Sequence, residues 1–501
     1  MTQINSAGTA IGSAGTAINS AGTAIGSAWT ALGGDPALLP RVAVVEREGA
    51  LRARLPVRRL ARACVGACAL AAAELGARRA GLGETPAVRV DDGAVATAFA
   101  SERHLLVDGR APVSFAPLSR FWPAADGWVR THANYPHHRE RLLRALGVLG
   151  AHASVETVGA ALAERSALDI EESVYAAGGL AVALRTPEQW AAHPQAAAVA
   201  ARPLVERERL DETHARVLPP LPDAAALLPA AGLRVLDLTR VLAGPVATRT
   251  LALLGADVLR LDAPHLPELA DQHADTGLGK RSATLDLAVE RAAFEELLAA
   301  ADIVVTGYRP GALDRFGLSP EALAERRPGL VVAQLSAWGG SGPWGGRRGF
   351  DSLVQAATGI AAAEGSRERP GALPAQALDH GTGYLLAAAV LRALTEQSAE
   401  GGSRVVRLTL ARTAAWLTGA AAAGADAAGA AETAPDAAGA APEGVGTVAA
   451  APYDGPGPWL AETDSRIGRL RYARSPVAFA GGPADWTRPP GPWGTDAARW
   501  V

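Results

Sequence analysis

The second half of the chain alternates short apolar runs with helical patterns, and this alternation limits the possible folds more than any other feature. The apolar runs LRVLDL, ADVLRLD, DIVVTGY and LVVAQLS are separated by segments with the period of an amphipathic helix. Strands of this length that alternate with helices favour a parallel sheet covered by helices. The sequence therefore predicts an α/β fold whose large domain is built on a Rossmann-like parallel sheet.

The chain opens with a repeat, in which INSAGTAIGSAGTA is followed by INSAGTAIGSAWTA. The repeat is uncharged and consists mostly of small residues, so it has little apolar surface to bury. Residues 1–32 are therefore predicted to be a disordered or weakly ordered leader.

Composition indicates where the domains and linkers of the rest of the chain begin and end. The Pro- and Ala-rich stretch VLPPLPDAAALLPAAG is typical of a linker, and a later stretch of Ala, Gly and acidic residues is typical of a flexible segment. The predicted order is a smaller α+β domain at 33–216, a linker at 217–232, the large domain at 233–415, a flexible segment at 416–445 and a C-terminal return to the large domain at 446–501.

Charge and cysteine content exclude several classes of partner. The 48 basic and 51 acidic residues nearly balance, and neither sign forms a long block, which argues against nucleic-acid and anionic-membrane surfaces. The longest apolar run, Cys64 to Ala73, is too short to cross a bilayer. Cys64 and Cys68 have no ligand residues beside them and are expected to be buried thiols of a reducing compartment. We expect a cytoplasmic protein.

Two kinds of site are poorly supported. His132, His137 and His138 have no carboxylate or cysteine at matching spacing, so no metal site is predicted and a surface or helix-capping role is expected. Asp262 closes the second strand, as an acidic residue does in dinucleotide-binding folds. The first turn, TRVLAGPVATR, nevertheless has one glycine and lacks the GxGxxG pattern, which argues against NAD binding.

Three loops carry residues suited to an anionic ligand or to covalent chemistry. The glycine loop GGSGPWGGRRGFDSLVQAATG contains Arg347 and Arg348, and YRPGALDRFGL places Arg309 and Arg315 after a strand. The stretch QALDHGTGYLLAAAV places Asp379 directly before a long apolar helix, near free backbone N–H groups. Each also has an ordinary interpretation, as a surface loop, as solvated charges and as a helix N-cap.

Residues 232 to about 415 resemble the large domain of the class III CoA-transferases, the family that contains formyl-CoA transferase. The matching motifs, in order, are LRVLDLTRVLAGPVATRTLALLGADVLRLD, GKRSATLDL, ADIVVTGYRPGALDRFGL, PGLVVAQLSAWGGSGPW, GFDSLVQAATG and the helix that follows Asp379. The resemblance implies that Asp379 is the catalytic nucleophile. The CoA contacts that it implies are Leu242, Ala243, Leu285, Gly307, Tyr308, Arg309, Arg315 and Arg348.

The implied reaction moves CoA between an acyl-CoA and a carboxylic acid. Asp379 would attack the thioester, giving a mixed anhydride and then an aspartyl-CoA thioester, and the helix N-terminus would keep the carboxylate ionised and help hold the oxyanions. Acyl-CoA is then a substrate, with no permanently bound cofactor and no metal. The resemblance also implies a homodimer whose two chains interlock.

Departures from the family pattern leave alternatives open. Leu242 stands where formyl-CoA transferase has glutamine, and Ala263 stands where it has an arginine, so formate and oxalate are not expected as substrates. The segment that resembles the family's small domain precedes the large domain, which indicates a rearranged or fused chain. An α-methylacyl-CoA racemase would need a histidine where this chain has Phe350, so transfer is favoured over racemisation. A third hypothesis is a non-catalytic CoA-binding fusion protein.

Overall fold

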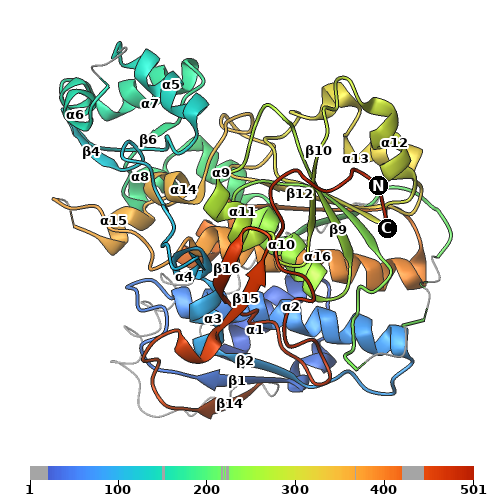
Figure 1. Ribbon diagram of the computed structural model, residues 1–501. Coiled ribbons are helices and arrows are strands. Elements are labelled where there is room, and N and C mark those ends of the chain that lie inside the picture. The colour runs from blue at the N-terminus through green and yellow to red at the C-terminus, as the bar shows by residue number, and fades with distance from the viewer. Residues whose placement is uncertain are drawn as a thin grey trace, which may run out of the picture.

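A computed structural model describes residues 21–148, 153–215, 218, 220–221, 225–366, 368–419 and 445–501. Its centre is a seven-stranded sheet of order β10-β9-β8-β11-β12-β13-β7 (Figure 1). The strands are β8 (Arg234–Leu238), β9 (Asp257–Asp262), β10 (Arg281–Thr284), β11 (Ile303–Thr306), β12 (Val331–Ser336), β13 (Arg404–Thr409) and β7 (Glu206–Arg209). Every neighbouring pair is parallel except β13 with β7. The predicted α/β fold with a parallel sheet is confirmed.

Alternate residues of the central strands supply two apolar faces. Val235 and Val305 belong to one buried cluster, which also contains α10 (Ala243–Leu253) and α16 (Ala377–Glu400). Leu236 and Val304 belong to a second cluster with α12 (Arg291–Ala299) and α13 (Pro320–Arg326). Successive side chains of a strand point to opposite faces, so near-continuous apolar runs are what a sheet buried on both sides requires.

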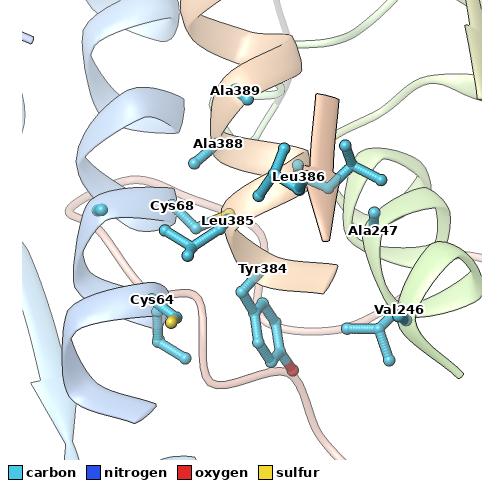
Figure 2. Close-up of a cluster of buried hydrophobic side chains, with 14 of the residues drawn as sticks. Cys64, Cys68, Val246, Ala247, Tyr384, Leu385, Leu386, Ala388 and Ala389 are labelled. Atoms are coloured by element: carbon cyan, nitrogen blue, oxygen red, sulfur yellow. The ribbon is translucent and has the colours of Figure 1, made fainter. Parts of the chain in front are cut away.

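Helix α2 (Val57–Ala80) forms a further layer on the outer side of α16. Figure 2 shows Cys64 and Cys68 on α2 near Tyr384 and Leu385 of α16. Both cysteines are free and fully buried, as expected. Among the described residues α2 is the one helix long and apolar enough to cross a membrane, and 94% of its apolar window is buried inside the protein.

The predicted weakly ordered leader is wrong for residues 21–32. Helix α1 (Ala21–Ala31) packs against α2, with Trp29 and Leu32 fully buried. The indole N–H of Trp29 donates to the carbonyl of Asp35, and the guanidinium of Arg392 lies 5.4 Å from the ring centre. Trp29 replaces Gly15 of the first repeat and supplies the apolar surface that the repeat otherwise lacks. Residues 1–20 lie outside the described residues.

The region predicted as one smaller domain, 33–216, contributes to several parts of the molecule. An upper lobe in Figure 1 holds β4 (Phe121–Ala124), β5 (Gly127–Thr131) and β6 (Ala181–Ala183) with α5 (Pro136–Ala145), α6 (Val155–Ala163) and α7 (Ala167–Ala176). In contrast, α2 shares the core of α16, and β7 is an edge strand of the central sheet. A single boundary at 216 therefore does not separate two cores.

The C-terminal segment takes part in three sheets. Strand β14 (Gly446–Ala449) pairs with β1 (Val42–Glu46), which pairs with β2 (Val88–Asp91). Strands β15 (Leu460–Ser465) and β16 (Gly468–Ala473) form a sheet with β3 (Leu106–Val107). Thr495 then bridges to Ala283 of β10, which is a return to the edge of the central sheet.

The two segments predicted as connections are partly packed. Ala230, in the predicted linker, is fully buried, and residues 216, 217, 219 and 222–224 lie outside the described residues. In the predicted flexible segment, residues 416–419 complete a helix that begins at 410, with Trp416 and Leu417 buried. Residues 420–444 are outside the described residues.

Candidate active site

The residues predicted from the sequence to form the site line one cavity of about 630 Å³. The lining includes Asp379, Leu242, Ala243, Leu285, Gly307, Tyr308, Arg309, Arg315 and Arg348. Most belong to turns that follow β8, β10 and β11, so the cavity opens at the carboxyl edge of the parallel strands, where ligands of open α/β sheets bind. The opposite wall comes from the N-terminal region, through Tyr135, His137, His138 and Arg141 of α5 and the residue before it.

Asp379 lies inside the first turn of α16 and not immediately before the helix. The helix begins at Ala377, and Oδ2 of Asp351 accepts hydrogen bonds from the backbone N–H groups of Leu378 and Asp379, each at 2.9 Å. The helix cap predicted for Asp379 is therefore provided by Asp351. Two of the N–H groups expected to hold an oxyanion are likewise occupied by Asp351.

The pKa values of Asp379 and Asp351 also differ from what the sequence predicts. Burial, followed by the nearby carboxylates of Asp351 and Glu102, raises the pKa of Asp379 well above its usual range. Burial raises the pKa of Asp351 to about 6, although the N–H of Asp379 and the side chain of Gln355 oppose the shift. This shift opposes the expectation that the helix N-terminus keeps Asp379 ionised, because desolvation and like charge both disfavour the charged carboxylate. The buried carboxyl pair retains protons at a pH where isolated aspartates have lost them.

This pair predicts an unusual dependence of stability on pH. Because the folded state binds more protons than the unfolded chain between about pH 4 and pH 6, the contribution of Asp351 to the free energy of unfolding falls as pH rises through that window. Relative to wild type, Asp351→Asn should gain up to about 3 kcal/mol between pH 4 and pH 7. Urea denaturation of both proteins across this range measures the difference. A difference that is constant with pH would contradict the raised pKa.

A cluster of cations lies elsewhere on the cavity wall. Partial desolvation lowers the pKa of Arg348, and the positive charges of Arg141 and Arg309 lower it further. Within the described part of the chain, no carboxylate forms an ion pair with Arg348 or Arg309, and Arg141 donates to the carbonyl of Gly178. Arginines that repel one another without acidic partners indicate a site for an anion such as phosphate. Arg315, like Arg309 and Arg348, is exposed, and its guanidinium lies 4.6 Å from the ring centre of Phe316.

The surface or capping role expected for the histidines is wrong for two of them. His132 and His138 are buried, at 3% and 5% exposure, and His132 stacks on Phe350 with ring centres 3.8 Å apart. Burial lowers the pKa of His132 to about 3 and that of His138 to about 2, so both imidazoles are neutral. His137 and His138 line the cavity. Among the described residues no three His, Cys, Asp or Glu side chains are grouped as metal ligands would be.

Comparison with known proteins identifies a family that part of the chain resembles. Residues 230–454 match the family model described as CoA-transferase family III. This region, called the family III region below, resembles that family. The family III region contains every residue that the sequence predicted for the site. The resemblance to class III CoA-transferases is confirmed.

Individual relatives of the family III region are named as CoA-transferases. A probable fatty acyl-CoA transferase of Mycobacterium tuberculosis, Rv3272, is 36% identical over 206 residues, which are 38% of this chain and 52% of the relative. The formyl-CoA:oxalate CoA-transferase of Streptomyces coelicolor is 36% identical over 189 residues, 35% of this chain and 46% of the relative. A crystal structure of Rv3272 aligns with 40% of this chain and 58% of the Rv3272 chain, with 36% identity and a TM-score of 0.36. The chain spans about half the length of the curated relatives it matches.

Several features of the cavity were not predicted from the sequence. Asp351 begins α14 (Asp351–Ala357), and nothing in the sequence shows that its carboxylate contacts the first turn of α16. Arg141 and His138 belong to α5, more than 200 residues before Asp379. The motif RERLLRALGV shows a helix at this position, but no local signal shows that the helix lies against a distant loop.

Proposed function

We propose that the protein is a CoA-transferase that moves CoA between an acyl-CoA thioester and a carboxylic acid, with Asp379 as nucleophile. One observation carries the proposal. A buried aspartate shares a cavity of about 630 Å³ with an arginine cluster for which the described residues offer no acidic partner, and Asp379, Arg309 and Arg348 all belong to the family III region. The cluster suits the phosphates of CoA, and the aspartate suits the reacting end of the thioester.

The proposed first half-reaction uses two displacements. A carboxylate oxygen of Asp379 attacks the thioester carbonyl carbon, the C–S bond breaks, and CoA leaves as a thiolate from a mixed anhydride. The thiolate then attacks the Asp379 carbonyl carbon of the anhydride, and the donor acid leaves as a carboxylate. The product is an aspartyl-CoA thioester.

The second half-reaction reverses these steps with the acceptor acid. The acceptor carboxylate attacks the Asp379 carbonyl carbon and displaces the CoA thiolate, which then attacks the acceptor's acyl carbon. The new acyl-CoA forms and the Asp379 carboxylate is regenerated, without net transfer of a proton. A carboxyl group with a raised pKa is a stronger nucleophile once it is ionised, so the environment of Asp379 favours attack at neutral to alkaline pH.

Covalent trapping tests this route. The protein is incubated with acetyl-CoA and, separately, with long-chain acyl-CoA thioesters in the presence of hydroxylamine, and its peptides are analysed by mass spectrometry. We expect an aspartyl hydroxamate on the peptide that contains Asp379, because hydroxylamine opens both the anhydride and the aspartyl thioester. The absence of this adduct across the panel would contradict the covalent mechanism.

The same samples separate the other hypotheses. Exchange of the α-proton of a 2-methylacyl-CoA with deuterated solvent, without hydroxamate, would favour a racemase-like reaction. CoA binding with neither outcome would favour a non-catalytic CoA-binding protein. The homodimer and the cytoplasmic location expected from the sequence remain parts of the proposal.

A further inference from the structure

Glu268 is a buried carboxylate that joins the two walls of the cavity. Its Oε1 accepts a hydrogen bond from the Tyr135 hydroxyl at 2.5 Å, and its Oε2 accepts one from the backbone N–H of Val241 at 3.0 Å. Arg260 donates to the same Oε2 at 2.8 Å, and a nitrogen of Arg240 lies 3.5 Å from Oε1. The side chain of Glu268 has no exposed surface and is not itself part of the cavity lining.

The turn held by Glu268 has a strained backbone. Val241 has φ of 71°, in the left-handed region that β-branched residues rarely adopt. Leu51 and Asp108 are the other non-glycine residues with positive φ in the described part of the chain, and neither lines the cavity. Strained residues persist where surrounding contacts hold them, and they are concentrated at functional sites. The next residues along the turn are Leu242 and Ala243, which line the cavity and begin α10.

The other contact of Glu268 reaches the opposite wall. Tyr135 immediately precedes α5, the helix that carries His137, His138 and Arg141 into the cavity lining. The guanidinium of Arg240 lies 4.9 Å from the centre of the Tyr135 ring, which adds a cation–π contact. One carboxylate therefore connects the turn after β8 to the start of α5.

We propose that Glu268 is a positioning residue that fixes the separation of the two cavity walls and thereby sets the affinity for acyl-CoA. The role rests on the proposed function for the identity of the ligand. Glu268 does not contact the reacting atoms. Although burial opposes it, the guanidinium groups of Arg260 and Arg240 lower the pKa of Glu268 to about 2, so the carboxylate is charged throughout the range in which the protein would work.

The test compares three variants of the full chain by calorimetric titration with CoA and by steady-state kinetics. Glu268→Gln keeps the shape of the side chain but removes its charge and replaces one oxygen by N–H₂. In either orientation this group meets a backbone N–H, of Val241 or of Leu269, from which it cannot accept, so the link between the walls is weakened. We expect the Kd for CoA and the KM for acyl-CoA to rise tenfold or more, with kcat changed less than threefold. Tyr135→Phe removes the α5 contact alone and should raise the same constants about threefold.

Asp275→Asn is the matched control. Asp275 is also buried, pairs with Arg249 at 3.1 Å and accepts from the Ser101 hydroxyl at 2.9 Å, but it does not line the cavity. This variant should lower the melting temperature and leave the Kd for CoA unchanged. Glu268→Gln with the same loss of melting temperature and a wild-type Kd would show that Glu268 is only structural.

The outcomes remain distinguishable if a variant is unstable. Should Glu268→Gln fail to fold, Tyr135→Phe decides, because its wild-type Kd would overturn the proposal and a raised Kd would support it. Failure of the wild-type protein to bind CoA would instead contradict the proposed function. A raised Kd without any transferase activity in wild type would retain the positioning role and remove the catalytic one.

Discussion

Asp379→Asn is expected to lower transferase turnover by several orders of magnitude while CoA still binds. The amide cannot form the anhydride, so neither half-reaction proceeds. At neutral pH the melting temperature should stay constant or rise, because the substitution removes a buried carboxyl group whose pKa is raised by burial, Asp351 and Glu102. Turnover of an identified acyl-CoA, CoA titration and thermal denaturation measure the three quantities.

Asp286, and not Asp351, provides the suitable control for this variant. In the sequence Asp351 heads a separate helix, but its direct hydrogen bond to the N–H of Asp379 makes Asp351→Asn a disturbance of the same site. Asp286 lines the same cavity, and its carboxylate accepts from the N–H of Ala288 at 2.9 Å, so Asp286→Asn is the better control and should retain the hydroxamate adduct. Asp379→Ala should be as inactive as Asp379→Asn and nearly as stable, because the helix cap belongs to Asp351. Wild-type turnover in Asp379→Asn would end the covalent hypothesis.

Arg348→Ala is expected to raise the Kd for CoA by one to two orders of magnitude. A charge-assisted hydrogen bond to a phosphate contributes about 1.5–3 kcal/mol, and Arg348 has no acidic partner among the described residues to which its charge is otherwise committed. The effect should weaken at high salt, because the contact is electrostatic. Calorimetric titration with CoA at two salt concentrations measures both expectations.

Arg315→Ala serves as the comparison within the same cavity. Arg315 is exposed, as Arg348 is, but its guanidinium stacks on Phe316 and lies outside the group formed by Arg141, Arg309 and Arg348. We therefore expect an effect of about threefold or less. The two variants together separate a localised phosphate site from a general effect of positive charge. Equal Kd values for Arg348→Ala and wild type would show that the implied CoA contacts are wrong at this position.

The central sheet could be predicted because its information is local. Apolar runs such as DIVVTGY match strands such as β11 closely, since a strand buried on both faces requires apolar residues at consecutive positions. The residues implied by the family resemblance share one cavity for a related reason. They belong to turns at the carboxyl ends of adjacent parallel strands, and such turns meet at one edge of the sheet.

Contacts between distant segments could not be predicted in this way. The hydrogen bonds from Leu378 and Asp379 to Asp351 cross between two loops, and nothing in either loop indicates the other. The raised pKa of Asp379 follows from its burial and then from the nearby carboxylates of Asp351 and Glu102, which the sequence does not place beside it. The folding of α1 depends on Trp29 meeting α2 and Arg392, which composition alone does not reveal.

The shared core of α2 and α16 has a consequence for how this chain can be divided. The family III region spans residues 230–454, but its helices and strands also pack against residues outside that range. An excised copy would lose α2 from the apolar side of α16, β7 from the edge of the central sheet, and the segment around Thr495 that lies along β10. The segment that resembles the family is therefore smaller than the segment needed to bury the apolar surface of the central sheet and α16.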